Sequence, residues 1–203
     1  MRRIAATLIA LALLGLQGCT NMATEKKTVT LDRAYWTKVR HRDLYDAPLW
    51  PTVCGLVQWT PGGQESYEQA QLRTARGMPE GLRYYFFIMG LDGQWGNGGM
   101  QSVVLSDDPA GSWKLVEGAA EALRFHGSEG RAKVLDELLA VAKVVEPKLQ
   151  TAIERDAPES ELQTLWDQID AFDDRYDKAD PGIDVYARIV KHAHQHPEEY
   201  VPR

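Results

Sequence analysis

Residues 82–91 read LRYYFFIMGL, and this stretch decides the fold. Apart from Arg83 and Gly90, every side chain in it is apolar or aromatic, so a helix built from it would be apolar almost all round. Such a helix has to be covered by other elements on all its faces. The stretch therefore predicts a central, buried helix around which the rest of the chain packs.

Apolar residues at helical spacing predict four further helices beyond residue 100. The first begins at Asp108, a favourable N-cap followed by proline, and stops at Gly127. The second is closed near Pro147, and the last is capped by Asp180, which also precedes a proline. The inward-facing residues are Trp113, Val116, Ala120 and Leu123; Val134, Leu135, Leu138, Leu139, Ala142 and Val145; Leu162, Leu165, Trp166, Ile169, Phe172 and Tyr176; and Tyr186, Ile189, Val190 and Ala193. The pattern predicts an all-α fold, a compact bundle of five or six helices.

Residues 31–64 differ from the remainder of the chain because aromatic residues, proline and glycine interrupt any regular period. We expect them to form an irregular segment packed on the bundle, with a possible short strand at residues 53–60. The helical domain then spans residues 65–203.

The amino terminus predicts a lipoprotein signal. Arg2 and Arg3 precede an apolar run over residues 4–16, which is too short to cross a membrane but has the length of a signal-peptide core. The sequence LQGC at residues 16–19 resembles a lipobox, which implies cleavage after residue 18 and lipid on Cys19. An ordinary secretory signal with an incidental cysteine is the alternative.

This resemblance sets the expected location. Residues 1–18 would be the signal peptide, and residues 19–30, which are mostly polar and small, a lipidated flexible tether. Thr20 stands where an aspartate would mark retention at the inner membrane. We therefore expect a cell-envelope protein, anchored to a membrane through lipid on Cys19, at the outer membrane and facing the periplasm.

Acidic residues gather in one part of the chain. The formal net charge is −6, and loss of Arg2 and Arg3 with the signal would make it −8. Residues 153–184 hold eleven acidic residues against three basic ones, a surplus of eight that equals the whole of that charge. Such a surface disfavours a nucleic acid partner and favours basic proteins or cations.

Five of these carboxylates fall on one arc of the predicted helix, about 120° wide. They are Asp167, Asp170, Asp173, Asp174 and Asp177. Apolar residues fill the neighbouring arc, so the carboxylates are expected to face outward as a stripe that binds a basic protein. A merely solvated face is one alternative, and a calcium site is another, although the spacing lacks the loop and the glycine of an EF-hand.

Asn97-Gly98-Gly99, placed after the apolar helix, and the ALxxxG pattern at residues 122–127 resemble a bacterial family named after a small acidic DNA-mimic protein. The resemblance covers about residues 80–197, and most members of the family are domains of unknown function. Asparagine and glycine tolerate positive φ, so the NGG sequence predicts a tight junction between two helices. Alternatively, exposed amides at the start of the following helix bind an anion or a partner's carboxylate.

Two histidines are weak candidates for metal binding. On a helix, His192 and His196 share a side, whereas His194 between them points away. Histidines near a helix end also complement its dipole, so we expect neither a metal nor a cofactor.

An enzyme is not expected. Cys54 is the one thiol left in the chain once Cys19 carries lipid, and its apolar neighbours favour a buried, inert side chain. A small hydrolase that uses Cys54 or His126 is an alternative, but no serine-hydrolase, zinc-protease or P-loop motif is present.

Together these features predict a membrane-anchored periplasmic lipoprotein that acts as a protein-binding module through an acidic helical surface. An immunity-type inhibitor of a basic toxin or enzyme, a DNA-mimic regulator of a DNA-binding protein and a purely structural envelope component are the remaining alternatives. A membrane between this domain and DNA-binding proteins would disfavour the DNA mimic.

Overall fold

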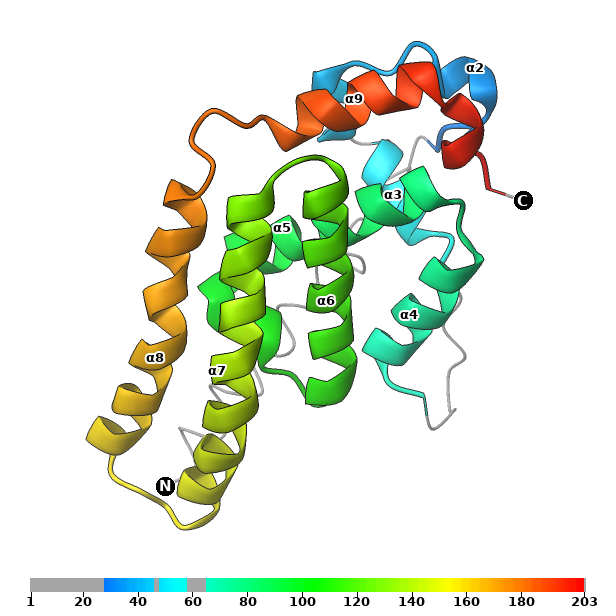
Figure 1. Ribbon diagram of the computed structural model, residues 1–203. Helices are drawn as coiled ribbons and strands as arrows, with labels where there is room; N and C mark the ends of the chain where they lie inside the picture. The colour runs from blue at the N-terminus through cyan, green and yellow to red at the C-terminus, as the bar shows by residue number, and fades with distance from the viewer. Residues whose placement is uncertain (1–27, 46–47, 58–64, 203) are drawn as a thin grey trace.

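The computed structural model describes residues 28–45, 48–57 and 65–202 (Figure 1). Within these ranges every regular element is a helix, which confirms the predicted all-α class. Six longer helices form the bundle: α4 (Tyr67–Gly77), α5 (Glu80–Val104), α6 (Pro109–Phe125), α7 (Glu129–Glu154), α8 (Glu159–Lys178) and α9 (Val185–Gln195). The shorter elements are α2 (Arg33–Trp36), α3 (Leu49–Cys54) and the 3-10 helices η1 (His41–Leu44) and η2 (Pro197–Tyr200).

The predicted signal peptide, Cys19, Thr20 and most of the predicted tether lie outside the described residues. Val29, near the end of that tether, donates its backbone N–H to the Thr52 hydroxyl at 3.1 Å. Among the helices that the structure describes, none combines the length and the apolar character needed to cross a membrane.

Helix α5 is central, as its sequence predicts. Its side chains Leu82, Tyr85 and Ile88 are almost completely buried. Helices α6, α7 and α8 lie side by side in an antiparallel row, and α5 crosses behind them (Figure 1). Helix α4 packs on α6, while α9 and η2 cover the first turns of α5. The core therefore lies between α5 and this row.

Helix α7 continues through Pro147, where the sequence predicts its end. A proline inside a helix removes one backbone hydrogen bond, at a cost of about 3 kcal/mol. Helix α7 nevertheless runs on to Glu154, and Leu149 and Ala152 in the additional turns are buried. Because α7 packs along α8, this burial compensates for the lost bond.

Asp180 caps a different helix from the one predicted. The first turn of α9 is capped by Asp184, which accepts the backbone N–H of Ala187 at 2.9 Å. Asp180 instead lies at the start of α7, where its Oδ2 accepts the backbone N–H of Arg131 at 3.0 Å and the Ser128 hydroxyl at 2.8 Å. Its carboxylate therefore joins the end of α8 to the beginning of α7.

The segment before α4 contains short helices that pack on the bundle. Trp36 of α2 is fully buried, with its ring centroid 6.1 Å from that of Tyr85 in α5 and 4.7 Å from that of Tyr200 in η2. The possible strand at residues 53–60 is wrong in its described part, because Val53 lies in α3. Residues 58–60 are outside the described ranges.

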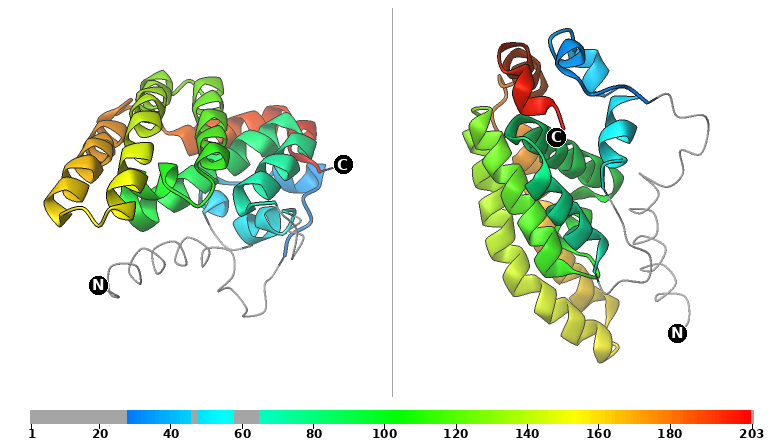
Figure 2. Two further views of the ribbon diagram at one scale, coloured as in Figure 1. Left: turned by 90° about the horizontal axis from the view of Figure 1, so that it is seen from below. Right: turned by 90° about the vertical axis from the view of Figure 1, so that its right-hand side faces the viewer.

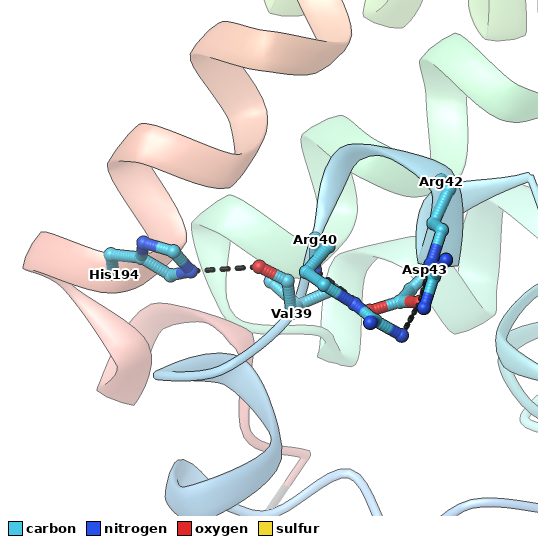
Figure 3. Close-up of polar contacts among 5 residues, drawn as sticks. All are labelled: Val39, Arg40, Arg42, Asp43 and His194. Carbon is cyan, nitrogen blue, oxygen red and sulfur yellow. Dashed lines mark hydrogen bonds and ion pairs between the residues drawn. The ribbon is translucent and has the colours of Figure 1, made fainter.

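Two hydrogen bonds tie this segment to the rest of the chain. The phenol of Tyr85 donates to the carbonyl of Leu44 at 2.9 Å. The Nε2–H of His194 in α9 donates to the carbonyl of Val39 at 2.7 Å (Figure 3). Since a carbonyl oxygen only accepts, the second bond fixes the His194 tautomer. His194 thus points away from any site shared by its neighbours, as its place between them predicts.

Candidate protein-binding surface

The carboxylates of residues 153–184 occupy four kinds of surroundings. Two contact α5, two cap other helices, two pair with a lysine or an arginine, and five have no cationic partner in the part of the chain that the structure describes. The predicted stripe is therefore divided between the inside and the outside of the bundle.

Asp173 and Asp170 face α5. The Oδ1 of Asp173 accepts the indole N–H of Trp95 and the backbone N–H of Met100, each at 2.8 Å. Asp170 accepts the side-chain amide of Gln101 at 2.6 Å. Both carboxylates are half-buried, so the prediction that they face outward is wrong. One edge of the predicted stripe therefore meets α5 instead of solvent.

Asn97-Gly98-Gly99 forms a kink inside α5, in agreement with the predicted junction between two helices. Gly99 has φ of 64°, a conformation that favours glycine, and a Cβ there would lie 2.7 Å from the Asp173 carboxylate. The alternative prediction was an anion on the amides that follow the turn. In the structure the Met100 amide is already occupied by the chain's own Asp173.

The outward carboxylates lie along α8 and at the tip of the α7–α8 hairpin, the end of the molecule farthest from α9 (Figure 2). We call this set the acidic hairpin surface; it consists of Glu154, Asp156, Glu159, Asp167, Asp174 and Asp177. All six are exposed. Three of its members, Asp167, Asp174 and Asp177, belong to the predicted stripe. The other three were predicted only as part of the acidic segment over residues 153–184.

Nearby cations neutralise little of this surface. Arg155 pairs with Glu161, and Arg175 reaches across to Glu137 of α7. Of the described cations, only Lys178 pairs with a member of the surface, Asp174, and that carboxylate is 82% exposed. The acidic hairpin surface is therefore strongly negative over its whole length.

The two candidate metal ligands lie near each other but make other contacts. The rings of His192 and His196 are 4.8 Å apart between centroids. The Nδ1 of His192 is 3.1 Å from the Tyr200 hydroxyl, which is hydrogen-bonding distance. Within the described ranges, no group of three or more His, Cys, Asp or Glu side chains is arranged to hold a metal ion.

The residues considered for a hydrolase lie on different elements. Cys54 is half-buried in the last turn of α3. His126 follows the last turn of α6 and is 4% exposed. The hollow beside His126 is open to solvent and is considered below.

A sequence profile of DMP19-like proteins matches residues 76–196, which is more than half of the chain. The chain belongs to the DMP19-like family. This agrees with the resemblance predicted for residues 80–197, and the family takes its name from a DNA-mimic protein. No curated protein and no solved structure matched. The part that is DMP19-like contains the α5 kink, Asp173 and the acidic hairpin surface, whereas Trp36 lies outside it.

Proposed function

We propose that this DMP19-like protein binds a basic protein through the acidic hairpin surface, while lipid on Cys19 holds it at the cell envelope. One observation carries the proposal. After all ion pairs and caps are counted, five exposed carboxylates of residues 153–184 have no cationic partner within the described ranges: Glu154, Asp156, Glu159, Asp167 and Asp177.

A basic partner would relieve the repulsion within this surface. Like charges on neighbouring helical turns are mildly destabilising, and their field attracts an oppositely charged protein and raises its association rate. Trp166 borders the same face of α8 and is half-buried, so an apolar anchor lies beside the charges. Interfaces commonly combine a central aromatic residue with a charged rim.

Removal of three outward charges should weaken partner binding about tenfold or more, if each exposed pair contributes roughly 0.5 kcal/mol. The variant is Asp167→Asn/Asp174→Asn/Asp177→Asn in the full chain, solubilised in detergent and used to capture proteins from an envelope extract. The amount of each captured protein is measured at low and at moderate salt.

The matched control is Asp107→Asn/Glu117→Gln/Glu129→Gln, which removes the same number of negative charges from exposed positions elsewhere. It should retain every partner that the wild-type protein captures. Equal loss in both variants would mean that net charge alone matters, and no loss in either would leave the acidic hairpin surface without a role.

Replacement of Cys19 by alanine should move the protein from the membrane fraction to the soluble fraction. Two or more acyl chains hold a protein stably on a bilayer, whereas a protein without an acyl chain is not held there. Cell fractionation and incorporation of labelled palmitate measure the effect. A Cys19→Ala protein that still sediments with membranes, or a wild-type protein that takes up no label, would contradict the anchor.

The family name favours a second candidate, a DNA mimic that occupies a DNA-binding protein. Rows of carboxylates can replace phosphates for such a partner, because its affinity is largely electrostatic. Duplex DNA should then compete with the chain for the captured protein. If the chain is an immunity-type inhibitor, the captured protein should instead be an enzyme whose activity falls when the complex forms.

A further inference from the structure

A hollow with two cationic side chains in its lining lies between the end of α6 and α9. It measures about 440 Å³, is open to solvent, and is lined mainly by Phe125, His126, Arg188, Lys191, His192 and Gln195. None of its lining residues is acidic, although the net charge of the chain is −6. The hollow thus has two cationic side chains, Arg188 and Lys191, in its lining, and the nearby Glu199 lies 3.8 Å from the Nε2 of His192.

The two cations of this hollow carry no carboxylate partner among the described residues. One guanidinium nitrogen of Arg188 donates to the carbonyl of His126 at 2.7 Å, which fixes the side chain at the edge of the hollow. A Cβ at Gly127 would lie 2.0 Å from that nitrogen, so glycine is required for this approach. Lys191 is exposed one turn further along α9 and forms no ion pair with any residue that the structure describes. Both positive charges therefore remain available.

His126 adds an unsatisfied polar group. Its side chain is buried, and its Nε2 has no hydrogen-bond partner in residues 28–45, 48–57 and 65–202. Burial, with the nearby His192 and Arg188, lowers the pKa of His126 to about 4, so the imidazole is neutral at neutral pH. A buried ring nitrogen without a partner is uncommon in folded proteins and needs an explanation.

An aromatic wall completes the hollow. Phe125 is 43% exposed, and its ring lies 4.9 Å from that of His192 and 5.0 Å from that of His126. An exposed aromatic ring beside two available cations suits a ligand with an apolar body and an anionic end. The planar guanidinium matches the oxygens of a carboxylate or a phosphate.

We propose that this hollow binds the oxyanion of a small aromatic or planar acid, with Arg188 and Lys191 holding the oxyanion and Phe125 contacting its body. The site is distinct from the acidic hairpin surface, because it is lined by residues at the end of α6 and on α9, and none of them belongs to that surface. It gives the chain a small-molecule ligand in addition to a protein partner.

The test uses the full chain in detergent, with labelled histidine, titrated with benzoate, phenyl phosphate, inorganic phosphate and the neutral benzamide. NMR signals of the His126 and His192 rings should shift saturably with at least one aromatic oxyanion, at a Kd in the millimolar range or tighter. Preference between benzoate and phenyl phosphate identifies the oxyanion. Shifts that stay linear with every compound, or benzamide binding as well as benzoate, would overturn the proposal.

Two variants locate the site. Lys191→Gln should weaken binding about twofold to fivefold through loss of one charge–charge contact, and Arg188→Gln should weaken it further. Because Arg188 also holds the His126 carbonyl, Lys191→Gln is the decisive variant if Arg188→Gln does not fold. Lys133→Gln removes the charge of an exposed lysine on α7 and should leave the Kd unchanged. Equal weakening by Lys191→Gln and Lys133→Gln would rule out this location.

Discussion

Replacement of Trp36 by alanine is expected to lower the free energy of unfolding by about 3–5 kcal/mol, the usual range for a large aromatic residue removed from a core. The side chain is fully buried between Tyr85 and Tyr200, so its loss opens a cavity where α2, α5 and η2 meet. Its indole nitrogen has no hydrogen-bond partner among the residues that the structure describes, so the expected effect comes from packing.

Urea unfolding followed by circular dichroism measures this change. Trp36→Phe is the matched control: it keeps an aromatic ring, removes the unsatisfied N–H, and should cost much less, about 1 kcal/mol. The free energy of unfolding of Trp36→Ala could instead lie within about 1 kcal/mol of the wild-type value. Residues 28–57 would then contribute little to the stability of the fold. The expected result makes that segment part of the domain, although it precedes the residues matched by the family profile.

Asp173→Ala is expected to destabilise the protein by about 2–4 kcal/mol, because two hydrogen bonds to a charged acceptor are lost and their donors stay partly buried. Those donors are the Trp95 indole and the Met100 amide at the α5 kink. Urea unfolding gives the magnitude, and the Trp95 indole N–H resonance reports the loss at the site. Asp174→Ala, the next residue on α8, is the control; its carboxylate is 82% exposed and its removal should change stability within experimental error.

The kink provides a second measurement of the same contact. Gly99→Ala is strained by the positive φ and brings a Cβ to 2.7 Å from the Asp173 carboxylate. Part of that strain disappears when the carboxylate is absent. Gly99→Ala should therefore destabilise the Asp173→Ala protein less than the wild-type protein, and strict additivity of the two changes would contradict a direct contact.

These results also separate folding from partner binding. Asp167, Asp174 and Asp177 are exposed, so their replacement should reduce capture of a partner and leave the unfolding curve almost unchanged. Asp173 lies next to Asp174 on the same helix but supports the α5 kink. A loss of binding on replacement of Asp173 would follow from unfolding rather than from a missing contact with the partner.

Local sequence predicts most helices of this chain because their signals act over a few residues. Asp108 caps α6 by accepting the Gly111 N–H, and Gly127 follows that helix with φ of 73°. The apolar period places α8 and α9 within a few residues of their observed bounds. The sequence did not predict α4 or the short helices before it. At Pro147 and Asp180, contacts with another helix outweigh the local signal.

The candidate surface was only partly predictable. On a helical wheel Asp173 lies between Leu162 and Trp166, inside the apolar arc, and this position was the signal that it faces inward. Asp170 gives no such signal, because it lies between the outward-facing Asp174 and Asp177 on the wheel. Its contact with Gln101 depends on where α5 crosses α8, which neither helix encodes alone.

The LRYYFFIMGL stretch by itself determined that a buried helix lies at the centre of an all-α bundle, because a helix apolar on every side cannot remain in water. The NGG sequence that follows this stretch predicted the kink, because glycine adopts backbone conformations that other residues avoid. Tertiary structure decided which carboxylate fills that kink, which acids stay outside, and that Trp36 closes the core. It also decided that Arg188 and Lys191 meet Phe125 in one hollow. Such contacts join residues far apart in the chain, and they exist only after the helices have packed.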